Sequence, residues 1–261
     1  MSFSAPESKF ELSATCTEIP TPAAIVTAVE RLVTRFKPFT TSTDVTSSRA
    51  PNYTPTYTAW CSRLQYYILM QYQKEKLDAD DGFSSGFNLF RGNALHDAFA
   101  RIYRWSELPL KINFPLSHGR SVIISGRLDM YEPTTAEILD LKTTKYLGWQ
   151  KKSNFVPRLK DLRQLAIYEI MYRKILPVKK LTILYADMAD IVAFDLPIPR
   201  DTEKWLTDRI EVIEYSRETK IPPPGEVTKL CDYCPFQNRC HNDGGGIVSE
   251  PKSKPEDLDL S

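Results

Sequence analysis

Three residues in the middle of the chain have the types and the spacing to hold a divalent cation and activate water. Asp140 and Lys142 are two residues apart in the apolar segment 137–143, so both side chains project from one face of an extended strand. Asp129 follows the apolar segment that begins at Ser121, and the Glu-Pro-Thr-Thr sequence between the segments is typical of a turn. The resulting hairpin would bring Asp129 beside Asp140. We expect the two carboxylates to bind a hard cation, with the Lys142 ammonium group available to orient or help deprotonate water.

The Asp-x-Lys triplet also has a simpler interpretation. Such triplets are common, and Asp140 and Lys142 could be a solvated ion pair on an exposed strand. The apolar residues around the triplet and the acidic residue upstream favour the catalytic interpretation.

Two further segments complete a known order of motifs. His96 ends the sequence Gly-Asn-Ala-Leu-His in one predicted helix, and Gln164 and Tyr168 lie four residues apart on a later one. Between them, the Gly-Arg-Leu-Asp sequence ending at Asp129 precedes the Asp-Leu-Lys sequence that begins at Asp140. In this order the chain resembles the RecB-like branch of the PD-(D/E)XK nuclease superfamily.

The resemblance implies a role for each of these residues. Asp129, Asp140 and Lys142 would be catalytic, and Gln164 and Tyr168 would bind the phosphate or sugar oxygens of DNA. The cation, Mg²⁺ or Mn²⁺, would be bound by His96, Asp129, Asp140 and the backbone carbonyl of Leu141. Without the resemblance, His96 would be interpreted as a core histidine, and the stripe that continues to Tyr172 as a half-buried polar face.

Three cysteines near the end of the chain are spaced as ligands of a metal or cluster. They form a C-x₂-C-x₅-C sequence made of Cys231, Cys234 and Cys240. A fourth ligand is needed, and the candidates are Cys16, Cys61 and His241. We favour Cys61, because the Trp-Cys-Ser-Arg sequence before an aromatic-rich helix resembles the N-terminal cysteine of iron–sulfur members of this branch. The resemblance implies a [4Fe–4S] cluster, and cysteine spacing alone does not exclude a four-cysteine zinc site.

Composition limits the classes of protein that fit. The formal net charge of +1 gives no global basic field, so DNA binding would need a local groove. Basic residues that could line it are Lys142, Lys145, Lys151, Lys152, Arg158, Lys160 and Arg163. The sequence has no apolar run long enough for a bilayer and no signal-peptide pattern, and its clustered cysteines do not suggest a secreted disulfide framework. We therefore expect a soluble, intracellular, cytoplasmic protein without membrane contact.

The pattern of elements predicts an α/β protein with a restriction-endonuclease-like core: a central mixed sheet flanked by helices, plus an iron–sulfur clasp. We expect strands at 121–128, 137–143, 181–186 and 191–196, and helices at about 21–36, 58–77, 92–105, 161–174 and 201–218. Residues 1–56 would form an N-terminal extension with a Ser/Thr/Pro linker. Residues 57–243 would form the RecB-like domain, and residues 244–261 a disordered tail.

Within the branch, the chain resembles in particular the CRISPR-associated Cas four family of exonucleases. That resemblance implies metal-dependent 5′ to 3′ hydrolysis at DNA ends, mainly of single strands, with CRISPR adaptation or recombination proteins as possible partners. A repair or viral context and an oligomer are also compatible. The chain has no P-loop and hence no motor of its own. Two alternatives remain open: a non-catalytic iron–sulfur subunit that binds DNA ends, and a zinc-clasped endonuclease.

Overall fold

The computed structural model describes residues 52–74, 82–144, 147, 155–187 and 189–245. Several expected features lie outside these residues. They are the helix at 21–36, Cys16, three lysines of the possible groove (Lys145, Lys151 and Lys152), and all but the first two residues of the tail. No helix in the described part of the chain combines the length and the apolar character needed to cross a lipid bilayer.

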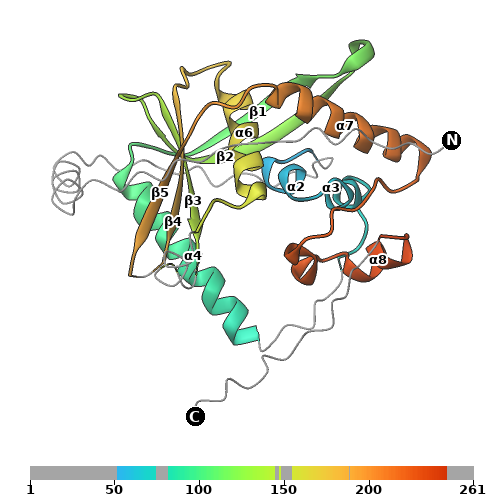
Figure 1. The fold of residues 1–261 in the computed structure, drawn as a ribbon, viewed down its shortest axis with the longest axis horizontal. Coiled ribbons are helices and arrows are strands. Elements are labelled where there is room, and N and C mark those ends of the chain that lie inside the picture. The colour runs from blue at the N-terminus through green and yellow to red at the C-terminus, as the bar shows by residue number, and fades with distance from the viewer. Residues whose placement is uncertain (1–51, 75–81, 145–146, 148–154, 188, 246–261) are drawn as a thin grey trace.

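A five-stranded sheet forms the centre of the molecule (Figure 1). Its strands lie side by side in chain order, namely β1 (Trp105–Pro115), β2 (Ser121–Glu132), β3 (Glu137–Thr143), β4 (Lys180–Ala186) and β5 (Ile191–Leu196). Neighbouring strands are antiparallel except β3 and β4, which are parallel and are joined through helix α6 (Leu159–Tyr172). The predicted α/β fold with a central mixed sheet is therefore confirmed.

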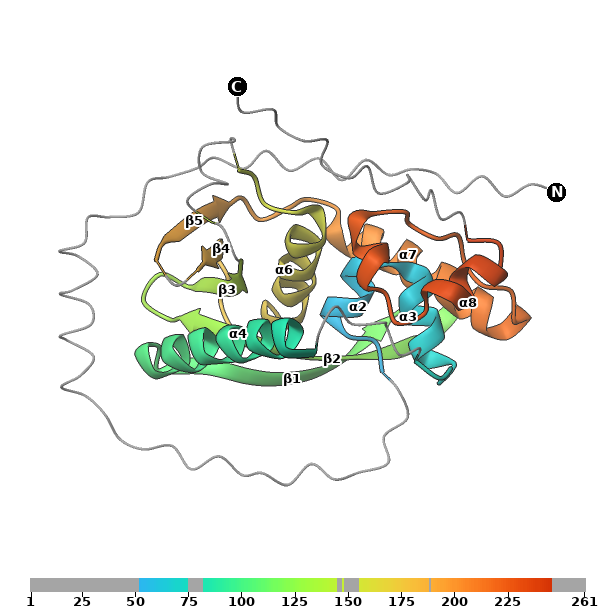
Figure 2. The same cartoon turned by 90° about the horizontal axis from the view of Figure 1, so that it is seen from below.

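Helices cover both faces of this sheet (Figures 1 and 2). On one face, α4 (Gly82–Ile102) packs Leu95 and Phe99 against a small core cluster that includes Met130 and Leu141. On the other face, the larger cluster joins α6 to α7 (Thr202–Thr219) and to the short helices near the start of the described chain. Because Leu139 and Leu141 face α4, the intervening Asp140 faces α6.

Strand β1 was missing from the sequence-based prediction, which continued its helix to Trp105. The helix in fact ends at Ile102, and an alternation of apolar residues then follows at Leu108, Leu110, Ile112 and Phe114. That alternation is the sequence signal for a strand, but Pro109 and Pro115 interrupt it. Prolines are tolerated here because β1 is an edge strand of the sheet.

The expected single helix at 58–77 is instead two helices. They are α2 (Pro55–Trp60) and α3 (Ser62–Leu69), and Cys61 between them has an extended backbone with φ −156° and ψ 132°. The side-chain oxygen of Thr54 caps α2 by accepting from the Tyr57 amide at 3.3 Å. Tyr53, which the expected boundary assigned to the extension, is buried in the core and bridges to Ile124 of β2.

Candidate functional site

Strands β2 and β3 separate where their two acidic residues lie. Their pairing ends at Met130 and Leu139, one residue before Asp129 and Asp140 would be opposite each other. Instead, Asp129 Oδ2 accepts a hydrogen bond from the Leu141 amide at 2.8 Å. The hairpin thus places Asp129 and Asp140 at the end of the paired region, where the Leu141 amide binds Asp129 and the charge of Asp129 acts on Asp140.

Asp140 is completely buried beside Lys142, on the same face of β3. Lys142 Nζ lies 2.5 Å from Asp140 Oδ2, and apart from this ion pair neither oxygen accepts a hydrogen bond within the described chain. Burial raises the pKa of Asp140 to about 7, Lys142 opposes this rise, and the negative charge of Asp129 adds to it. Lys142 offsets only part of the cost of burying this carboxylate, because the pKa of Asp140 stays raised despite the ion pair. Its environment fits a hard divalent ion.

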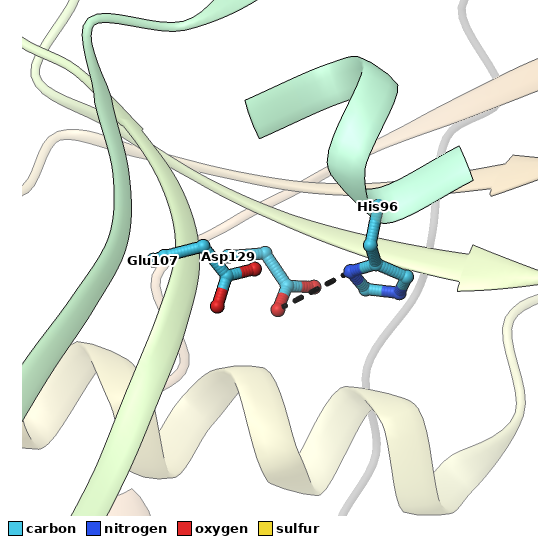
Figure 3. Close-up of side chains that lie close together, drawn as sticks. All are labelled: His96, Glu107 and Asp129. Carbon is cyan, nitrogen blue, oxygen red and sulfur yellow. Dashed lines mark ion pairs between the residues drawn. The ribbon is translucent and has the colours of Figure 1, made fainter. Parts of the chain in front are cut away.

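His96 reaches the same place from helix α4 (Figure 3). Its Nδ1 atom lies 3.8 Å from Asp129 Oδ1. Burial lowers the pKa of His96, and the nearby positive charge of Lys142 lowers it further. The imidazole is therefore biased toward its neutral form, which is the form that coordinates metals.

Glu107 of β1 also belongs to this group, and sequence analysis did not identify it. One ligand atom from each of His96, Glu107 and Asp129 lies within 4.8 Å of the other two. Figure 3 shows the two carboxylates facing the imidazole from neighbouring strands. Glu107 was missed together with its strand; the alternation that begins at Leu108 would have indicated the strand, but not the placement of Glu107. Among the described residues, no other three histidine, cysteine or acidic side chains approach so closely.

The predicted DNA-binding residues lie on α6, behind strand β2. Tyr168 is buried, and its hydroxyl donates a hydrogen bond to the Arg127 carbonyl at 2.8 Å. A Cβ atom on Gly126 would lie 2.9 Å from Pro55 and 3.0 Å from the Tyr168 ring, so only glycine allows this close packing. Tyr168 therefore holds β2 in place just before Asp129. Gln164 is partly buried one turn earlier, and DNA contact by either side chain stays a prediction.

The four cysteines favoured as cluster ligands line one cavity of about 40 Å³. They lie at the junction of α2 and α3 (Cys61), in and after the short helix Lys229–Tyr233 (Cys231 and Cys234), and in helix α8, Gln237–Asn242 (Cys240). All four are free thiols. Among the described residues, no three of the cysteine sulfurs all lie within 4.8 Å of one another. His241, the alternative fourth ligand, does not line this cavity.

Arg63 joins the two chain segments that contribute these cysteines. Its Nε donates to the Pro223 carbonyl at 2.7 Å, and its Nη1 donates to the Cys240 carbonyl at 3.2 Å. Figures 1 and 2 show the result: the C-terminal segment around α8 lies beside α3.

Glu226, which also lines the cavity, connects it to the rest of the fold. It forms ion pairs with Arg209 of α7 and with Arg163 of α6, the latter at 2.7 Å. Its carboxylate also accepts from the Ser62 amide at 3.1 Å. Arg163 is thus paired with Glu226 beside the cysteine cavity and is only partly exposed; its part in a DNA groove stays a prediction.

Comparison with known proteins identifies the family. Among solved structures, one titled "Crystal structure of SSO0001" matches with a TM-score of 0.53 and 16% identity, over 84% of this chain and 96% of that chain. At this identity the match shows a shared fold alone. No curated protein matches. The family model of the PD-(D/E)XK nuclease superfamily matches residues 95–241, which span more than half of the chain and include His96, Asp129, Asp140 and Lys142. The chain therefore belongs to the PD-(D/E)XK nuclease superfamily.

Proposed function

We propose that the protein is a metal-dependent DNA exonuclease that hydrolyses phosphodiester bonds at DNA ends. Superfamily membership supports a metal-dependent nuclease with DNA as substrate. The observation that carries the proposal is Asp140, a fully buried carboxylate whose one close donor among the described residues is the Lys142 ammonium group. Such an arrangement is costly to keep in a fold, and it suits a site that binds a cation and a water molecule.

In this mechanism the cation would be held by His96, Asp129, Asp140 and the Leu141 carbonyl, with Glu107 nearby. When bound, a divalent ion polarises the scissile phosphate and lowers the pKa of water. Burial lowers the pKa of Lys142, but the charges of Asp140 and Asp129 outweigh this and raise it overall. Lys142 is therefore a stable ammonium group before metal binding. We infer that it orients the attacking water and offsets the negative charge that develops on phosphate, rather than acting as the base.

The finer features of the activity follow from the resemblance to the Cas four family. They are action on single strands, 5′ to 3′ polarity, and a place in CRISPR adaptation, repair or recombination. Tyr168 and Gln164 would set the position of the strand over the cation, Tyr168 acting at least partly through β2.

We also propose that Cys61, Cys231, Cys234 and Cys240 bind a [4Fe–4S] cluster. The proposal rests on the resemblance to iron–sulfur members of the RecB-like branch, and it is supported by the four free thiols that line one cavity. Iron and zinc analysis of anaerobically purified protein, together with its visible spectrum, tests this assignment.

The nuclease proposal is tested with end-labelled single- and double-stranded DNA, with and without Mg²⁺ or Mn²⁺. Wild-type protein should shorten labelled strands only with metal, and Asp140→Asn should not. Asp208→Asn, which alters an exposed ion pair with Lys204 on α7, is the matched control and should cleave normally. Tight binding of DNA ends by wild-type protein without any cleavage would favour the non-catalytic alternative instead. Cleavage that survives Asp140→Asn would contradict the proposal.

A further inference from the structure

Glu107 is a charged side chain that the proposed mechanism does not use. It is one-third exposed, and its Oε2 atom lies 2.6 Å from Nε of Arg127 on β2. A carboxylate oxygen of Glu107 nevertheless lies within 4.8 Å of ligand atoms of His96 and Asp129. Glu107 therefore faces both an arginine and a candidate metal centre.

The backbone is distorted at Glu107 in a way that regular strands are not. Glu107 has a φ of +53°, which non-glycine residues rarely adopt. The pairing of β1 with β2 skips this residue and the facing Asp129, although it continues on both sides. Leu128 packs in the core cluster facing α6 and Met130 in the cluster facing α4, so the alternation of β2 slips at Asp129. Both strands are thus bent where they carry their acidic side chains.

Two tyrosines of α6 bind backbone carbonyls next to this irregularity, one on β2 and one on β1. The Tyr168 hydroxyl donates to the carbonyl of Arg127, which precedes Leu128 on β2. The Tyr172 hydroxyl donates to the carbonyl of Leu108, the residue after Glu107 on β1. Each bond satisfies a strand carbonyl next to the break, so the strained conformation is supported by the core rather than left to fluctuate.

The electrostatic balance of the region also favours a cation. Glu107, Asp129 and Asp140 supply three carboxylates, and Asp140 is fully buried with no close donor among the described residues other than Lys142. The neighbouring side chains that oppose them are Lys142, committed to Asp140, and Arg127, whose side chain is 68% exposed. An exposed guanidinium group can leave a carboxylate at little cost.

We propose that Glu107 is an additional ligand of the divalent cation, and that Arg127 occupies its carboxylate until the cation binds. The cation and the Arg127 guanidinium then compete for the same carboxylate, so metal binding releases Arg127 to solvent. This inference rests on the proposed function, because it adds a ligand to the metal centre of that nuclease.

The experiment is a calorimetric titration with Mn²⁺ alone, without DNA, of full-length protein from which divalent cations have been removed. Glu107→Gln keeps the size of the side chain but removes its charge, and we expect it to weaken Mn²⁺ binding by about tenfold or more. Arg127→Gln removes the competitor and should tighten Mn²⁺ binding by a few fold. Opposite changes are expected because one residue binds the ion and the other excludes it.

The matched control is the exposed ion pair between Arg120 and Glu218, in which the nitrogen and oxygen lie 2.8 Å apart. Glu218→Gln should leave Mn²⁺ affinity unchanged. A purely structural pair at Glu107 and Arg127 predicts lower melting temperatures for both variants with wild-type Mn²⁺ affinity, and that result would overturn the inference. In that case, metal-dependent DNA cleavage by the wild-type protein from the same preparation would show that the proposed function is still correct. Conversely, opposite affinity changes in a protein that cleaves no DNA would support the ligand and reject the nuclease.

Discussion

Lys142 Nζ lies 2.5 Å from Asp140 Oδ2, and this single contact holds a fully buried carboxylate whose other neighbours offer no hydrogen bond within the described chain. The two residues are two positions apart and therefore lie on one face of the strand, so their geometry needs only a regular β3. Its energetic setting depends on α6 and on the bend in β2, which enclose it.

Metal binding should depend on pH through Asp140. The pKa of this carboxyl rises from 3.8 to about 7 in the folded protein, chiefly through burial. In metal-free protein the free energy of unfolding is therefore fully retained below pH 3.8, where Asp140 is neutral in both the folded and the unfolded state. It falls as the pH rises toward 7, because the buried carboxyl resists ionisation in the folded protein. A cation replaces the proton, so Mn²⁺ should raise the melting temperature strongly at pH 8 and little at pH 5.5. An increase that is equal at both pH values would contradict this role for Asp140.

Removing the ammonium group should reveal the buried charge. Lys142→Met leaves Asp140 with no partner, so we expect a loss of about 3 kcal/mol in the free energy of unfolding at pH 8. The loss should be smaller at pH 5.5, where Asp140 is protonated, and cleavage should be abolished at both values. Denaturant titrations measure the first effect. Lys204→Met, at the exposed pair with Asp208, is the control and should change stability little.

Tyr168 can be tested for its two possible roles. Tyr168→Phe removes the hydroxyl that bonds to the Arg127 carbonyl, so the free energy of unfolding should fall by about 1 kcal/mol. Cleavage should slow because β2 positions Asp129, while the affinity for a DNA end stays close to that of wild type. Tyr215→Phe alters an exposed tyrosine and serves as control. Weaker DNA binding with unchanged stability would instead indicate direct contact with the substrate.

The cysteine cavity predicts a second group of phenotypes. Cys61→Ser should remove visible absorbance and iron, and should lower the stability of the whole domain, because the ligand set joins segments far apart in sequence. Cys16→Ser should change neither property. Metal analysis and thermal melting of both variants provide the check. Stoichiometric zinc without iron in wild-type protein would reject the iron–sulfur assignment and leave the nuclease site unaffected.

Local patterns were sufficient to predict most of the sheet. Residue alternation and turn chemistry gave β3 and β5 with the bounds that the structure has, and β4 to within one residue. The same patterns placed Asp140 and Lys142 on one face of a strand. These features depend on neighbouring residues, which a sequence displays directly.

Features that depend on distant packing were missed. The strained Glu107 is stable because Tyr172, far along the chain, bonds to the next residue's carbonyl. The break at Cys61 between two helices is likewise compatible with a helical sequence, and it is fixed by the contacts of Arg63 with the C-terminal segment. The stripe of Gln164, Tyr168 and Tyr172 was recognised, but not that both tyrosines hold strands.

The bond from Arg63 to the Cys240 carbonyl joins residues 177 positions apart. During synthesis, α2 and α3 leave the ribosome long before their C-terminal partner exists, so this contact must be among the last to form. Until then Cys61 and Arg63 have no partners from α8 or its loop. A chain that ends before α8 lacks the Cys240 side of the cysteine cavity, so the cavity can close only in a chain that extends through α8.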